Sequence, residues 1–163
     1  MAVQGNPAQT AKNEIEITRV INADRAMVFK AWTDPKQLAA WWGPRGFSAP
    51  VCRADAHPGG EIYIEMRGPD GVVYPMKGTF QEVVPPERIV FVSAALDKDG
   101  NPLFEVLNTA TFAEQGKKTA LTLHARVLTK TPMADQYLVG MEVGWNQSLD
   151  RLAEFNETGR ISG

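Results

Sequence analysis

The sequence has few of the residues that form metal centres or nucleophile sites. It contains one cysteine, Cys52, and two histidines, His57 and His124, among 163 residues. A lone cysteine cannot form a disulfide within its chain, which is typical of proteins in a reducing compartment. We expect Cys52 to be a buried, inert thiol. The histidines lie far apart and no ligand pair has zinc-site spacing, so we expect no metal and no cofactor.

The chain also lacks a strong charge excess and a long apolar run. Its 17 lysine and arginine residues are scattered and balanced by 19 aspartate and glutamate residues, which gives a net charge of −2. Nucleic-acid binding needs a concentrated basic face, so we expect no nucleic-acid partner. The absence of a long apolar run argues against membrane insertion. The first residues lack the basic start and apolar core of a signal peptide, so we expect a cytoplasmic protein.

The distribution of small polar residues predicts one folded domain. Residues 1–12 show no hydrophobic period and are expected to form a disordered tail, as are residues 159–163. Residues 13–158 then form a single domain, long enough to bury about two-thirds of its unfolded surface. No repeat and no linker indicates a second domain.

The ordered part begins with one strand and two short helices. Apolar and polar residues alternate over 14–21, which predicts a half-buried strand. Asp24 is a candidate N-cap for a helix that reaches about Trp32. Asp34, followed by proline, begins the second helix. The second helix has its apolar residues on one side: Leu38, Trp41 and Trp42.

Beyond these helices, turn residues alternate with strand patterns as far as residue 127. The expected strands after the first turn span residues 61–67, 73–83, 88–95, 104–114 and 119–128. Each connection is short enough to join antiparallel neighbours, so a meander is the simplest topology. A last helix, the longest, is expected from Thr131-Pro132 to about residue 156 or 157.

The last helix carries an apolar stripe that two glycines interrupt. The stripe consists of Tyr137, Leu138, Met141, Trp145, Leu149, Leu152 and Phe155. Gly140 and Gly144 lie one turn apart within it, and each costs about 1 kcal/mol relative to alanine in a helix interior. Two reasons are open: close approach of the helix backbone to the sheet, or space for a ligand. A sheet that curls around a straight helix diverges from it at one end, which favours a cavity there.

Strand alternation and the connection after the second helix identify the residues that could line such a cavity. The candidate ligand-binding residues are Trp41, Trp42, Phe47, Ile64, Met66, Tyr74, Met76, Phe80, Phe91, Asn108, Met141 and Trp145. Candidate polar groups for orienting a ligand are Tyr74, Asn108, Ser93, Glu82 and the Trp145 indole, although Glu82 is expected at the solvent. The alternative is a solid core in which the same residues pack against one another.

Several segments, taken in order, resemble one known family. They are residues 31–35 (AWTDP), 41–47 (WWGPRGF), 58–60 (PGG), 66–71 (MRGPDG), 85–91 (PPERIVF) and 144–152 (GWNQSLDRL). They resemble activator-of-heat-shock-ATPase-like domains of the START-like superfamily, also called SRPBCC, which includes the birch-pollen allergen and polyketide cyclases. The resemblance covers about residues 15–155. It implies an α+β helix-grip fold, in which a curved antiparallel β-sheet wraps a long C-terminal α-helix and two short helices follow the first strand.

Three functions stay open, because this architecture hosts unrelated activities. The first is binding or carriage of a small hydrophobic or aromatic molecule in an internal cavity. The second is a cyclase- or hydrolase-like enzyme, which needs an inward titratable group. The third is a protein-interaction module of the heat-shock-chaperone activator type.

The catalytic residues of such an enzyme are unknown from the sequence. His124 alternates out of phase with the apolar residues of its strand, which places it toward solvent. Cys52 and His57 could meet, but no third group that would orient them is identifiable. The oligomeric state is also open, since an exposed strand edge could pair two chains into a homodimer.

Overall fold

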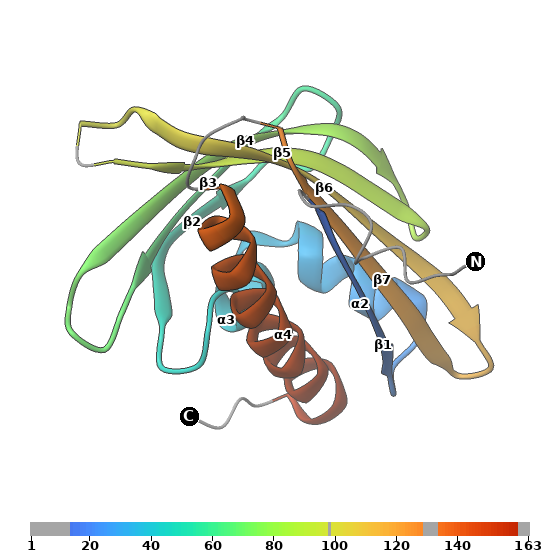
Figure 1. The fold of residues 1–163 in the computed structure, drawn as a ribbon. Helices are drawn as coiled ribbons and strands as arrows, with labels where there is room; N and C mark the ends of the chain where they lie inside the picture. The colour runs from blue at the N-terminus through green and yellow to red at the C-terminus, as the bar shows by residue number, and fades with distance from the viewer. Residues whose placement is uncertain (1–13, 98, 129–133, 160–163) are drawn as a thin grey trace, which may run out of the picture.

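A computed structural model describes residues 14–97, 99–128 and 134–159 of the chain (Figure 1). Its elements are β1 (Glu14–Ile21), α2 (Arg25–Thr33), α3 (Pro35–Trp41), β2 (Ser48–Ala54), β3 (Glu61–Arg67), β4 (Val73–Val84), β5 (Arg88–Leu96), β6 (Pro102–Gln115), β7 (Lys118–Val127) and α4 (Ala134–Thr158). The predicted tail at residues 1–12 and the predicted helix start at Thr131-Pro132 lie outside the described residues. The expected strand and helix order is otherwise confirmed.

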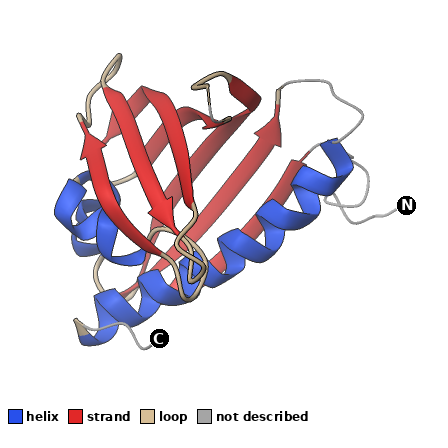
Figure 2. Cartoon of the chain, turned by 90° about the vertical axis from the view of Figure 1, so that its left-hand side faces the viewer, coloured by secondary structure: helices blue, strands red, loops and turns tan. Residues whose placement is uncertain are grey.

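The strands form one antiparallel sheet in the order β1-β7-β6-β5-β4-β3-β2. The predicted meander is confirmed from β2 to β7, and β1 closes the sheet by pairing with β7, with Ile17 opposite Leu123. Since β1 and β2 occupy opposite edges, the chain crosses one face of the sheet through α2 and α3. The sheet curves over α4, and α2 and α3 lie under the same concave side (Figure 1). A view turned by 90° shows α4 running beneath the strands (Figure 2).

The two short helices begin where the sequence indicates. The Asp24 carboxylate accepts a hydrogen bond from the Met27 amide at 3.0 Å and caps α2. The Asp34 carboxylate caps α3 by accepting from the Lys36 amide, also at 3.0 Å. Each cap pairs a backbone donor that the first helical turn leaves without a partner. The capped helices bring two tryptophans, Trp32 and Trp41, under the sheet.

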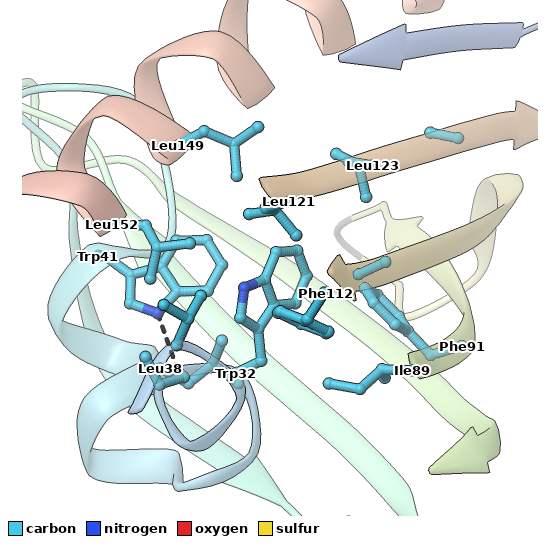
Figure 3. Packing of buried hydrophobic residues seen from close by; sticks show 14 of the residues in the cluster. Trp32, Leu38, Trp41, Ile89, Phe91, Phe112, Leu121, Leu123, Leu149 and Leu152 are labelled. Atoms are coloured by element: carbon cyan, nitrogen blue, oxygen red, sulfur yellow. Dashed lines mark hydrogen bonds between the residues drawn. The ribbon is translucent and has the colours of Figure 1, made fainter. Parts of the chain in front are cut away.

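The core forms where these helices, the sheet and the C-terminal half of α4 meet. The Trp32 and Trp41 rings lie 4.8 Å apart between centroids. The Trp41 indole N–H donates to the Ala31 carbonyl at 2.8 Å, which joins α3 to α2. Leu149 and Leu152 of α4 are fully buried against them (Figure 3). At this end of α4, packed apolar side chains fill the space between the helix and the sheet.

Arg19 of β1 holds the middle of α4 to the edge of the sheet. Its guanidinium donates to the Asn146 side-chain oxygen at 2.8 Å and to the Asn146 carbonyl at 3.2 Å. It also pairs with the carboxylate of Asp150, one turn further along the helix. Both partners of that ion pair are partly solvated, so its main effect is to set the position of α4 rather than to add much stability.

The outer face of the sheet agrees with the predicted alternation. His124 lies on this face, and its Nε2 atom is 2.8 Å from a carboxylate oxygen of Glu14 on the neighbouring strand. Leu121 and Leu123, out of phase with it, are fully buried on the inner face. His124 is therefore remote from the concave side of the sheet.

Leu152→Ala should lower the free energy of unfolding by about 2–5 kcal/mol, because truncation leaves a void in the closed part of the core. Urea denaturation of the purified variants measures this loss. Val139→Ala is the matched control on the same helix, since Val139 is 66% exposed. We expect its effect to stay within about 0.5 kcal/mol. Equal losses in the two variants would contradict the assignment of the core.

Candidate functional site

A cavity of about 630 Å³ lies between α4, the sheet and the connection from α3 to β2. This volume is within the range of about 300–1,000 Å³ that small-molecule sites occupy. From α4 the wall contains Gly140, Met141, Gly144, Trp145 and Ser148. The connection contributes Trp42, Gly43, Pro44 and Phe47. The strands contribute Met66, Tyr74, Pro75, Met76, Ser93, Ala95, Phe104, Val106 and Asn108.

The two glycines of α4 face open space. A methyl group built at Gly140 would meet no atom of another described element within 4 Å. At Gly144 the nearest such atom is Cγ of Pro44, at 3.9 Å, which is an ordinary contact. Close packing of the helix backbone on the sheet therefore does not explain either glycine. The two residues mark the stretch where α4 stands away from the sheet.

Of the predicted ligand-binding residues, one group lies on the wall of the cavity and another does not. Those on the wall are Trp42, Phe47, Met66, Tyr74, Met76, Asn108, Met141 and Trp145. Those elsewhere are Trp41, Ile64, Phe80 and Phe91, which are at most 1% exposed and belong to the packed core. The alternation pattern identifies the inner face of a strand, but it does not show how far along the strand the helix still makes contact. That any wall residue contacts a ligand remains a prediction.

Sequence reasoning missed Ser148 and several other wall residues. Ser148 lies one helical turn after Gly144, so the spacing of α4 could have placed it beside the cavity. Ala95 follows Ser93 at the strand period of two, and that signal was also available. Gly43 and Pro44 lie in a connection without any period, and only the folded structure reveals their position.

Aromatic rings form one end of the wall. The Trp145 indole stacks on Trp32, with centroids 5.7 Å apart and planes inclined by 14°. The Trp42 ring meets Trp145 edge to face at 5.2 Å. Each ring is thus held by another ring in a favourable geometry, and both present fixed surfaces to the cavity.

The opposite side of the cavity is more exposed. Tyr74 packs against Phe47, with ring centroids 5.8 Å apart, and is 43% exposed. This pair joins the start of β4 to the connection that precedes β2. Because both rings line the cavity while Tyr74 also contacts solvent, they mark its rim.

Two buried polar residues lie on the described wall, Asn108 on β6 and Ser148 on α4. Asn108 is 1% exposed, and its side-chain nitrogen donates to the Ser93 hydroxyl oxygen at 2.9 Å. The same nitrogen is 3.3 Å from the carbonyl oxygens of Phe91 and Val106. The Ser148 hydroxyl on α4 accepts from the Gly43 amide at 3.1 Å. Glu82 pairs with Arg88 in an exposed position away from the cavity, as expected.

The described part of the wall carries no carboxylate, imidazole, thiol or basic side chain. The phenol of Tyr74 is its one titratable group. Cys52 lies on β2 beside the core, and burial raises the pKa of its thiol to about 11, so it stays protonated at neutral pH. His57 pairs with Asp55 in the exposed turn after β2, where hydrogen bonds to the Pro58 carbonyl and to Asp55 raise its pKa.

Arg151 of α4 fixes the connection that forms one wall of the cavity. It is 7% exposed, and its guanidinium donates to the carbonyls of Gly43 at 2.8 Å, Pro44 at 3.1 Å and Trp42 at 3.3 Å. Burial lowers the pKa of Arg151 from its ordinary value, and the charge of Arg45 adds to this effect. The positively charged guanidinium, which can only donate hydrogen bonds, thus holds the backbone of the connection to α4.

Two further contacts hold the same connection. The Arg45 amide donates to the side-chain oxygen of Gln147 at 3.1 Å. The Arg45 guanidinium pairs with the Glu154 carboxylate, and this hydrogen bond is the main cause of the raised pKa of Arg45. Sequence reasoning noted Arg151 only as part of a segment that carries the resemblance. An arginine between the buried leucines at positions 149 and 152 was the available signal.

Residues 22–157 match the family described as activator of Hsp90 ATPase homolog 1-like protein. The chain belongs to this family. The match spans the elements from α2 to α4, so all the cavity residues lie within the activator of Hsp90 ATPase homolog 1-like region. The expected helix-grip fold of the START-like superfamily is confirmed.

Solved structures of similar proteins share this fold. A protein from Chromobacterium violaceum is 31% identical over 89% of this chain and 97% of its own, with a TM-score of 0.77. A protein from Nitrosomonas europaea is 26% identical over 91% of this chain and 97% of its own, with a TM-score of 0.76. A protein from Arthrobacter aurescens has a TM-score of 0.81 at 23% identity, over 90% of this chain and 87% of its own, and shows the fold alone.

No curated protein matches the chain significantly. Within the described ranges, none of the helices combines the length and the apolar character needed to cross a membrane.

Arg151→Met should lower the free energy of unfolding by about 1–3 kcal/mol, because the apolar stem remains while the buried carbonyls of the connection lose their donor. Urea denaturation provides the measurement. Arg126→Met is the matched control, since Arg126 is exposed on the outer face of β7. Equal stability of the two variants would show that Arg151 does not hold the connection.

Proposed function

We propose that this protein binds or carries a small apolar or aromatic molecule in the cavity. The observation that supports the proposal most strongly is the open space in front of Gly140 and Gly144. Each glycine destabilises a helix interior by about 1 kcal/mol relative to alanine, and no packing contact compensates for this. A binding site that needs the space explains why side chains are absent there.

The composition of the wall supports an apolar ligand. Methionine, phenylalanine and tryptophan side chains make up most of the large groups, including Met66, Met141 and Trp145. An apolar wall without an occupant loses dispersion contacts on one side, and a ligand would restore them. Methionine side chains can adjust to ligands of different shape, whereas the stacked indoles provide flat surfaces for an aromatic ring.

The enzyme hypothesis has less support from the described wall. General acid–base catalysis needs a titratable group within reach of the substrate, and Tyr74 at the rim is the one such group on the described wall. The chaperone-activator hypothesis derives from the family name, and a family name states no activity of this chain. Binding or carriage is therefore the function that we propose.

A neutral fluorescent probe, N-phenyl-1-naphthylamine, should bind the protein and raise its melting temperature. At a free concentration of about 100 times Kd the stabilisation is about 2.7 kcal/mol. For a chain of this size that corresponds to a shift of roughly 5–10 °C. Differential scanning fluorimetry and fluorescence titration measure the two effects.

Two substitutions at Gly144 locate the binding site. Gly144→Phe should weaken probe binding at least tenfold, because its ring occupies the cavity, while the variant stays folded. Gly144→Ala is the control, which should keep the probe and gain about 0.5–1 kcal/mol of stability, because alanine favours the helix. Full binding to a folded Gly144→Phe variant would contradict the proposal.

Mass spectrometry with gentle ionisation should detect a small molecule retained by freshly purified protein. We expect an added mass that disappears on denaturation, since a bound ligand dissociates when the cavity is lost. The Gly144→Phe variant, purified in the same way, should lack that mass. An added mass of equal abundance in both proteins would place the molecule outside the cavity.

A further inference from the structure

The polar groups on the cavity wall limit the chemistry of its ligand. The described wall has no charged side chain, so a charged group inside it would lose hydration without gaining a counter-ion. Two neutral groups, Ser93 of β5 and Asn108 of β6, lie together on the inner face of the sheet. Their hydrogen bonds determine which donor and which acceptor remain for a ligand.

The orientation of the Asn108 amide follows from its partners. The nitrogen faces the carbonyl oxygens of Phe91 and Val106, each at 3.3 Å. A carbonyl oxygen only accepts hydrogen bonds, so the amide nitrogen and not the amide oxygen must lie on that side. The Oδ1 atom then points away from these partners, and it receives no hydrogen bond from any described residue. Within the described parts of the chain, Asn108 therefore keeps one free acceptor.

The same amide determines the role of Ser93. Its hydroxyl oxygen accepts the Asn108 N–H at 2.9 Å, which is the shortest of the three contacts. A serine hydroxyl has one proton of its own to donate, and within the described chain no acceptor takes it. The Ser93 hydroxyl can thus donate toward the cavity, next to the free acceptor of Asn108.

We propose that the ligand is a neutral aromatic alcohol whose hydroxyl group accepts a hydrogen bond from Ser93 and donates one to Asn108 Oδ1. The inference rests on the proposed function, because it names the ligand class of the same cavity. A hydroxyl group both donates and accepts, so it satisfies both sites at once. A ketone or an ether would pair with Ser93 alone. The ring system then lies against the apolar wall that includes Trp145 and Met141.

Four compounds with one ring system test this assignment by displacing N-phenyl-1-naphthylamine at neutral pH. 2-Naphthol can make both hydrogen bonds, 2-methoxynaphthalene accepts only, naphthalene makes none, and 2-naphthoate carries a charge. We expect 2-naphthol to bind about tenfold more tightly than naphthalene, because two net hydrogen bonds are gained in an apolar surrounding. 2-Methoxynaphthalene should lie between them, and 2-naphthoate should bind most weakly.

Ser93→Ala should reduce the advantage of 2-naphthol over naphthalene from about tenfold to about threefold, because only the hydrogen bond to Asn108 Oδ1 remains. The fold should survive, since the Asn108 nitrogen keeps two backbone acceptors in this variant. Ser48→Ala is the matched control, because Ser48 is an exposed residue of β2 that does not line the cavity. The advantage of 2-naphthol should be unchanged there.

Each contrary result has a separate meaning. Equal affinity of the wild-type protein for 2-naphthol and naphthalene would overturn the inference and leave the proposed function intact. An undiminished advantage in Ser93→Ala would overturn the assignment of Ser93 as a donor to the ligand, and tight binding of 2-naphthoate would overturn the neutral ligand class. Failure of the apolar probe and of all four compounds to bind would refute the proposed function and this inference together.

Discussion

The burial of the C-terminal half of α4 is the constraint on which the rest of the structure depends. Leu149 and Leu152 are fully buried with Trp32 and Trp41, so apolar packing sets the position of the C-terminal half of the helix. A straight helix fixed at one end diverges from a curved sheet at the other. The cavity is the consequence of that divergence, and Gly140 keeps side-chain atoms out of it.

Polar contacts then fix the positions of the connection after α3, which forms one wall of the cavity, and of α4 itself. Arg151 donates to consecutive carbonyls of the connection after α3, and Arg19 fixes the neighbouring turn of α4 to β1. Arg19 acts on the middle of the helix, at Asn146, whereas Arg151 extends from the packed half of the helix to the connection. These charge-assisted hydrogen bonds position the elements around the cavity without side chains that would fill it.

Much of the fold could be predicted because its signals are local. The caps at Asp24 and Asp34, the strand alternation and the short turns each depend on a few neighbouring residues. The candidate site was less predictable. Trp41 and Phe91 have the apolar character of wall residues, but they are buried in the packed core. Ser148 and Arg151 were missed because their partners are more than 100 residues away in the sequence.

The sequence alone determined the element order, the face of each strand and the two positions in α4 where a side chain is missing. These are properties of short segments, and short-range sterics and hydrogen bonding set them. Only the tertiary structure decided that the glycines face empty space, that Asn108 and Ser93 form one hydrogen-bonded pair, and that the connection closes on α4. Those outcomes depend on how far a curved sheet separates from a straight helix, and no local pattern encodes that distance.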